Sequence, residues 1–164
     1  MSTQDNLQEA FAGESQANRK YLAFAEKAED EGFNRIAKLF RAAAAAETVH
    51  AHKHLNVMGG IKSTKENLEE AIEGETQEYT KMYPQMILEA EKEGGNEKAI
   101  QSFDFANKVE SIHANLYRNA LENMDNNESV DYYVCQVCGN TVENEAPDKC
   151  HICGALSSMF TKID

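Results

Sequence analysis

The feature that most constrains this chain is a pattern of glutamate and histidine that occurs twice. In each half of the sequence a lone glutamate is followed by Glu-x-x-His, after 33 residues in the first half and 35 in the second. The residues are Glu14, Glu47 and His50, and then Glu75, Glu110 and His113. Residues three apart on a helix point in nearly the same direction, so each Glu-x-x-His can offer an oxygen and a nitrogen to one metal ion.

All these residues lie in segments with helical periodicity. Apolar residues recur at steps of three and four, and glycine-containing breaks near residues 32, 59 and 94 separate the segments. We therefore predict four long helices, over about residues 3–30, 34–58, 64–93 and 97–124, with a kink at Pro84 in the third. Four such helices predict a mainly α fold built on a four-helix bundle.

The glutamates interrupt otherwise apolar stripes. A buried carboxylate without a partner costs several kcal/mol, and two metal cations would offset that cost. Four carboxylates and two imidazoles suit iron or manganese better than a thiolate-seeking metal, so we predict a dinuclear centre. Glu78 lies one turn beyond Glu75 and is either a further ligand or a solvated side chain, whereas its counterpart in the first half is Ala17. Tyr21 and Tyr83 can supply a hydrogen bond, a proton or an electron, or only pack.

The C-terminal segment carries a second metal pattern. It has two CxxC pairs, each followed by glycine, which are Cys135 with Cys138 and Cys150 with Cys153. Four thiolates at this spacing form a tetrahedral site for zinc or iron, and a redox-active dinuclear centre on the same chain favours iron. We therefore expect a helical domain over residues 1–128 and a small β-rich metal domain over residues 129–164, joined by a polar linker at Asp125–Ser129.

The net charge and the hydropathy of the chain disfavour some classes of binding partner. The formal net charge of −12 disfavours nucleic acid and anionic membranes, because binding phosphate needs a basic surface. No stretch approaches the roughly 18 apolar residues of a membrane helix, and the N-terminal segment MSTQDNLQEA has no basic start or apolar run. We expect a cytoplasmic protein, in which paired cysteines bind metal rather than form disulfides.

With these motifs the chain resembles the rubrerythrin family over nearly its whole length. The matching stretches are FAGESQA at 11–17, ETVH at 47–50, GETQEY at 74–79, MYP at 82–84, ESIH at 110–113 and the closing CxxCG pair. The resemblance implies a ferritin-like diiron bundle, a rubredoxin-like module with one iron, and reduction of hydrogen peroxide to water. An NAD(P)H-dependent reductase or a rubredoxin would supply electrons. Ferroxidase or oxidase activity, and iron storage or metal sensing, are the alternatives.

The resemblance also implies ligand roles. Glu47 and Glu110 would bridge the two irons, Glu14 and Glu75 would be terminal ligands, and His113 would bind one iron. The other iron would exchange His50 for Glu78 on oxidation, which makes these two residues, with Tyr21 and Tyr83, the candidate catalytic groups. His151 stands where proline is common in the rubredoxin-like knuckle.

The connection between the two halves predicts a dimer. If the second hairpin is related to the first by a twofold axis, the second and third helices are parallel, and their connection must span the bundle. Residues 59–64 reach only about 20 Å, whereas the second helix is nearly 40 Å long at about 1.5 Å per residue. We therefore expect a homodimer with exchanged helical hairpins, an ordinary monomeric bundle being the alternative.

Overall fold

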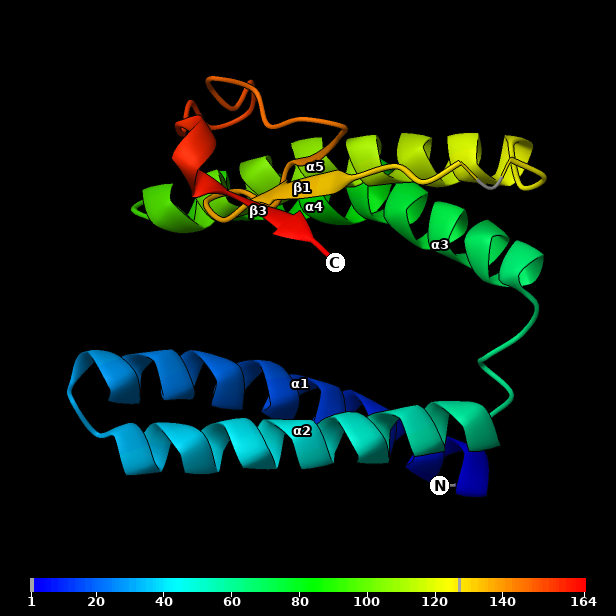
Figure 1. The fold of residues 1–164 in the computed structure, drawn as a ribbon, viewed down its shortest axis with the longest axis vertical. Helices are drawn as coiled ribbons and strands as arrows, with labels where there is room; N and C mark the ends of the chain where they lie inside the picture. Colours follow the sequence, from blue (N-terminus) through cyan, green and yellow to red (C-terminus); the bar gives the residue numbers. More distant parts are fainter. Residues whose placement is uncertain (1, 127) are drawn as a thin grey trace. The chain divides into compact units, whose positions relative to one another are not determined.

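The computed structural model describes residues 2–126 and 128–164, so Met1 and Asn127 lie outside the described residues. The chain divides into two compact units, Met1–Lys62 and Ser63–Asp164 (Figure 1). Each unit contains one pair of antiparallel helical segments, and the second also contains the small sheet. The two units are described in turn.

The first unit is a helical hairpin of α1 (Thr3–Asp30) and α2 (Asn34–Val57). The side chain of Ser2 caps α1 by accepting a hydrogen bond from the Asp5 N–H at 3.1 Å, and the Asp5 carboxylate accepts from the Ser2 N–H. Gly32, with φ of 82°, permits the tight turn between the helices. Small side chains make the buried seam, so the two backbones approach closely; they are Ala25, Ala28, Ala37, Ala44 and Ala51.

The second unit begins with a longer hairpin. Its first arm is α3 (Thr64–Gln77), a π-helical turn η1 (Glu78–Met82) and α4 (Tyr83–Glu93), and its second arm is α5 (Glu97–Glu122). Ser63 and Glu66 form a capping box at the start of α3. Both α3 and α4 contact α5, with Ala90, Val109 and Ala114 buried.

The π-helical turn corrects the prediction of a single kinked third helix. The interruption lies at Glu78–Met82, before Pro84, which occupies the first turn of α4. The N–H of Tyr83 bonds to the carbonyl of Glu78, five residues back. Pro84 has no N–H and its ring clashes with the carbonyl four residues back in a regular α-helix, so a wider turn suits it. The turn places Glu78 at the boundary between two helical segments.

The C-terminal module is a three-stranded antiparallel sheet with order β2-β1-β3. Its elements are β1 (Tyr132–Cys135), β2 (Thr141–Glu143), the 3₁₀ turn η2 (Ser157–Met159) and β3 (Phe160–Ile163). Tyr133 pairs with Val142 on one side and with Lys162 on the other. β2 contacts α5, which joins the module to the helical part of the same unit.

The predicted class, mainly α with a small β-rich C-terminal module, is confirmed. The described residues of the predicted linker are non-helical, with Asn127 outside the description. Among residues 2–126 and 128–164, no helix combines the length and the apolar character needed to cross a bilayer.

Candidate metal centres

The first hairpin brings three of the predicted ligands together. Nδ1 of His50 on α2 lies 2.9 Å from Oε2 of Glu47, one turn earlier on the same helix, and 3.7 Å from Oε1 of Glu14 on α1. The side chain of His50 is 55% exposed. Two ligand atoms at right angles on a metal, each about 2.1 Å from it, are about 3 Å apart, so this donor set fits one edge of a metal site.

The second hairpin repeats this arrangement with the same distances. Nδ1 of His113 on α5 lies 2.9 Å from Oε2 of Glu110 and 3.7 Å from Oε1 of Glu75 on α3. In each cluster one nitrogen and two carboxylate oxygens lie within 4.8 Å of one another. The side chain of His113 is only 27% exposed. The two halves of the sequence therefore fold into two equivalent half-sites, one in each unit.

A hydrogen bond from the C-terminal module distinguishes the two histidines. Nε2 of His113 lies 2.9 Å from Oγ1 of Thr141, and the same hydroxyl lies 3.2 Å from the carbonyl oxygen of Gly139. A carbonyl only accepts, so the hydroxyl donates to Gly139 and accepts from Nε2–H of the imidazole. In a neutral imidazole Nδ1 is then the unprotonated nitrogen, and it faces the two carboxylates. His50 has no corresponding bond among the described residues.

The carboxylates of the second half-site are crowded in the absence of cations. Burial and the neighbouring charge of Glu110 raise the pKa of Glu75 to about 7. Burial also raises the pKa of Glu110, although a hydrogen bond with Glu75 partly opposes this. Burial and the charge of Glu75 raise the pKa of Glu78. A group of acids that resists ionisation together is one that bound cations would stabilise.

The two tyrosines occupy similar places in their hairpins. Tyr21 packs against Phe40 with ring centroids 6.1 Å apart and planes at 34°, and Tyr83 packs against Phe103 at 6.3 Å and 36°. Burial, followed by the charges of Glu110, Glu78 and Glu75, raises the pKa of Tyr83. In the part of the chain that the structure describes, neither hydroxyl makes a hydrogen bond. The structure thus places Tyr83 near the carboxylates.

The repeat explains the π-helical turn. Tyr21 follows Glu14 by seven residues, whereas Tyr83 follows Glu75 by eight. Seven residues are close to two α-helical turns, so an eighth would rotate Tyr83 away by about 100° in a regular helix. A π-helical turn absorbs one extra residue. The mismatch of one residue between the halves was the sequence signal for this turn.

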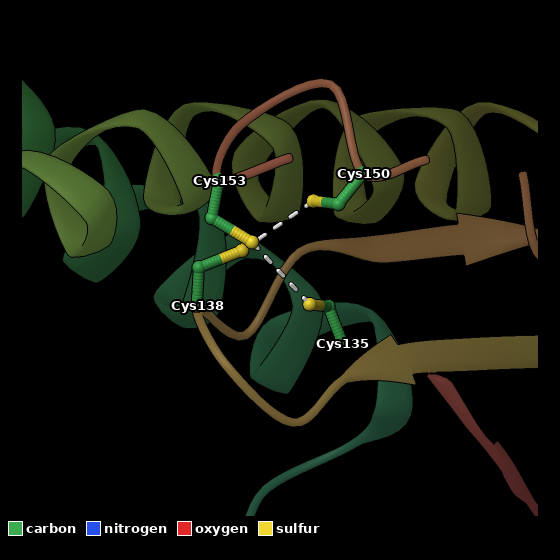
Figure 2. Close-up of side chains that lie close together, drawn as sticks. All are labelled: Cys135, Cys138, Cys150 and Cys153. Carbon is green, nitrogen blue, oxygen red and sulfur yellow. Dashed lines mark hydrogen bonds between the residues drawn. The ribbon is translucent and has the colours of Figure 1, made fainter. Parts of the chain in front are cut away.

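The four cysteines converge between the two knuckles of the module (Figure 2). All four are free thiols, and their sulfur atoms lie within 4.8 Å of one another. Sγ of Cys135 is 3.7 Å from that of Cys153, and Sγ of Cys138 is 3.6 Å from that of Cys150. Sulfur atoms about 2.3 Å from one tetrahedral metal are about 3.8 Å apart. The spacing therefore fits a four-thiolate metal site and is too long for a disulfide.

The thiols differ in acidity. Burial raises the pKa of Cys138 and of Cys153, and the thiols of Cys135 and Cys150 add to both increases. Burial also acts against ionisation of Cys150, but the N–H groups of Cys153 and Ile152 outweigh it and lower the pKa of Cys150 to about 7.

Two residues of the sites were missed by sequence reasoning. Thr141 contacts His113 across 28 positions of sequence, and no local pattern indicates such a pairing. Asn140 is fully buried beside the cysteines. Its place directly after the first CxxCG was visible in the sequence, but its side-chain direction was not.

Comparisons with known proteins agree with these two centres. The family model described as rubrerythrin matches residues 5–121, and the model of the rubrerythrin rubredoxin-like domain matches residues 133–161. Rubrerythrin-2 of Clostridium acetobutylicum is 34% identical over 96% of this chain and 95% of its own. Nigerythrin of Nitratidesulfovibrio vulgaris is 35% identical over 98% of this chain and 86% of its own.

A solved structure of nigerythrin in its fully reduced, all-ferrous state superimposes with a TM-score of 0.61 at 34% identity, covering 99% of this chain and 87% of that one. The ferritin-like and rubredoxin-like architecture is therefore confirmed, as are the predicted cofactor sites for a diiron centre and for one iron on four cysteines. On the motifs, the geometry and these matches, the chain belongs to the rubrerythrin family.

Proposed function

We propose that this protein is a non-haem diiron peroxidase that reduces hydrogen peroxide to water, with electrons that come from NAD(P)H through a reductase or a rubredoxin. The observation that supports it most is the direct bond between the four-cysteine module and a ligand histidine, from His113 Nε2 to Thr141 Oγ1 at 2.9 Å. A four-cysteine module that only stabilised the fold would not need to contact a proposed ligand of the diiron centre.

The residues proposed to hold the diiron centre are the two half-sites with one addition. They are Glu14, Glu47, His50, Glu75, Glu78, Glu110 and His113. The third site would use Cys135, Cys138, Cys150 and Cys153. When bound, the paired irons would supply the two electrons for cleaving the O–O bond, and the four-cysteine iron would return them one at a time from the external donor.

The protein side chains supply positions and protons. Reduction of one peroxide to two waters consumes two protons, so a donor beside the carboxylates is needed. Tyr83 lies beside these carboxylates, and its phenol, which is ordinarily protonated at neutral pH, is the candidate donor. Thr141 holds the far side of the His113 ring, whereas no described residue makes the corresponding bond to His50. Glu78 lies on the π-helical turn, and we propose that it exchanges with His50, as the resemblance implies.

The electron path is tested by separating the two half-reactions. Cys138→Ser should slow reduction of the diiron centre by the donor, while the prereduced protein still reacts with peroxide at nearly the normal rate. Stopped-flow spectroscopy of each step measures this. Equal loss in both steps would count against a relay role for the module. Faster oxidation by oxygen or by added ferrous iron than by peroxide would instead favour an oxidase or ferroxidase.

We also propose that two chains exchange hairpins, so that the half-site on α1 and α2 of one chain meets that on α3 and α5 of its partner. The six residues between α2 and α3 reach only about 20 Å, whereas the 24-residue α2 is about 36 Å long. Large apolar side chains remain exposed on both units of the single chain and need cover; among them are Phe24, Ile36, Leu39, Met86 and Leu88.

Complementation between two inactive variants tests the exchange. Heterodimers of Glu47→Ala and Glu110→Ala chains, purified through two different tags, contain one bundle with both substitutions and one with neither if hairpins are exchanged. They should recover about half of the wild-type diiron content and peroxide reduction. In an unexchanged dimer every bundle carries one substitution, so no recovery would exclude the exchange.

A further inference from the structure

Asn140 is a buried polar residue that the proposed function does not use. It lies between the first cysteine knuckle and β2, and it is completely inaccessible to solvent. Its main-chain carbonyl accepts a hydrogen bond from the N–H of Cys135 at 2.9 Å. Its side-chain Nδ2 lies 3.5 Å from Sγ of Cys150 and 3.4 Å from Nδ1 of His151. The amide oxygen is buried and has no hydrogen-bond partner among the described residues.

The neighbours of this amide determine its orientation. A metal-bound thiolate carries no proton, so the sulfur of Cys150 only accepts. The opposite orientation would point the amide oxygen at that sulfur, with two electron-rich atoms in contact. Nδ2 must therefore face Cys150, and its other neighbour, Nδ1 of His151, then serves as an acceptor, with the imidazole proton on Nε2. The unpartnered oxygen of Asn140 follows from directing the N–H groups at the metal site.

His151 explains why the amide is held there. The residue follows Cys150 directly, at the position where the family resemblance implies that proline is common. Proline has no side-chain acceptor, whereas the imidazole of His151 accepts from the same Nδ2 that approaches the sulfur. Asn140 and His151 thus form a pair: one supplies the donor and the other restrains it.

We propose that Asn140 is a positioning residue that raises the reduction potential of the four-cysteine iron through an N–H···S bond to Cys150, with His151 holding the amide in place. The inference rests on iron occupying this site, as the proposed function also requires. Reduction by one electron adds negative charge to the four sulfurs, and a hydrogen-bond donor stabilises the more negative state more strongly. Loss of the donor should therefore favour the oxidised form.

The test is a redox titration of the full-length, iron-loaded protein, followed through its thiolate-to-iron absorption. Asn140→Leu has a similar volume and no donor, and we expect the ratio of reduced to oxidised iron at a fixed potential to fall about tenfold, which is about 59 mV for one electron. Gln136→Leu is the matched control: Gln136 lies in the same knuckle, but its amide donates to the Val134 carbonyl at 3.0 Å and to no sulfur. The reduction potential of the four-cysteine iron should be the same in Gln136→Leu as in the wild type.

A second measurement needs no substitution, so it tests the N–H···S bond of Asn140 even if Asn140→Leu does not bind iron. With an NMR-active cadmium isotope in the four-cysteine site, a scalar coupling between cadmium and a side-chain amide proton of Asn140 is expected through the N–H···S bond. Absence of this coupling, an unchanged potential in Asn140→Leu, or an equal shift in Gln136→Leu would overturn the role of Asn140. Wild-type protein that binds no iron at this site would instead overturn the proposed function.

Discussion

The two hairpins share one ligand geometry but differ in what surrounds it. In both, the histidine Nδ1 is 2.9 Å from the glutamate one turn earlier and 3.7 Å from the glutamate of the other helix. In the second hairpin Thr141 holds the far side of the histidine ring, and Glu78 begins a π-helical turn. In the first hairpin the histidine is half exposed, and the position of Glu78 is taken by Ala17.

This difference suggests that the two ligand sets, although equal in geometry, have different roles in binding metal. A histidine with both ring nitrogens engaged has one orientation, whereas one with a single engaged nitrogen can leave its metal at low cost. We therefore propose that an iron beside His50 would change its ligands with oxidation state, whereas an iron beside His113 would keep them.

The largest loss of activity and iron should follow substitution of the ligand geometry that the two hairpins share. Glu47→Ala and Glu110→Ala each remove an inward carboxylate, and we expect each to lower peroxide reduction by more than about 100-fold and the iron content from about three per chain to about one. Metal analysis and steady-state assays measure both. Substantial activity in one of the two variants would show that the hairpins are not equivalent in binding metal.

The next effect should appear in one hairpin only. Thr141→Val removes the acceptor for Nε2–H of His113, and we expect iron to leave the diiron centre about ten times more readily in competition with a chelator. Thr141→Ser should restore retention. The matched control is Thr48→Val in the first hairpin, where the hydroxyl bonds to Ala44 and Asn18 and to no histidine. An equal loss in the control would remove the special role of Thr141.

A smaller effect concerns pH and the metal-free protein. The pKa of Glu75 is raised to about 7 by burial and by Glu110, from an ordinary value of 4.5. Between these values the folded state binds more protons than the unfolded state, so stability falls as pH rises from about 5 to 8. We expect a decrease of about 1–3 kcal/mol in the free energy of unfolding.

Urea denaturation of metal-free protein at several pH values measures this decrease. Glu75→Gln should flatten it, and loading with metal should abolish it because the cations neutralise the carboxylates. If Glu75→Gln leaves the pH dependence of the free energy of unfolding unchanged, a group other than Glu75 causes that dependence.

The smallest effect should come from removing the extra residue of the second hairpin. Deletion of Lys81 combined with Pro84→Ala gives the glutamate and tyrosine the seven-residue spacing of the first hairpin. We expect the free energy of unfolding to change by no more than about 1 kcal/mol, with the ring of Tyr83 still packed on Phe103. If a solved structure of the variant shows that the Tyr83 ring no longer packs on Phe103, the π-helical turn does more than accommodate one extra residue.

The sequence was sufficient for the parts of the molecule that depend on local spacing. The boundaries at Thr3 and Asp30 followed from helical periodicity and the glycine break, and the clustering of Glu110 with His113 followed from the geometry of one turn. The cysteine module followed from two CxxC knuckles. The prediction of one third helix kinked at Pro84 was wrong, because the one-residue difference between Glu14–Tyr21 and Glu75–Tyr83 was not taken as a sign of a π-helical turn.

The contacts that depend on tertiary packing were not predictable. The bond between Thr141 and His113 needs the sheet to lie against α5, and periodicity does not determine that placement. The same is true of Asn140, whose side chain turns inward to Cys150 rather than outward to water. The domain division after residue 128 and the individual ligand roles stay predictions.

The π-helical turn has a consequence for how the two halves diverged. If the chain arose by duplication of one helical hairpin, a residue gained in a regular helix would have turned every later side chain by about 100° and broken the packing of α4 on α5. Confining the extra residue to Glu78–Met82 leaves Tyr83 stacked on Phe103 as Tyr21 is on Phe40. A single added residue next to Glu78 can thus be accommodated in one half of the chain while the packing inherited from a symmetric ancestor is preserved.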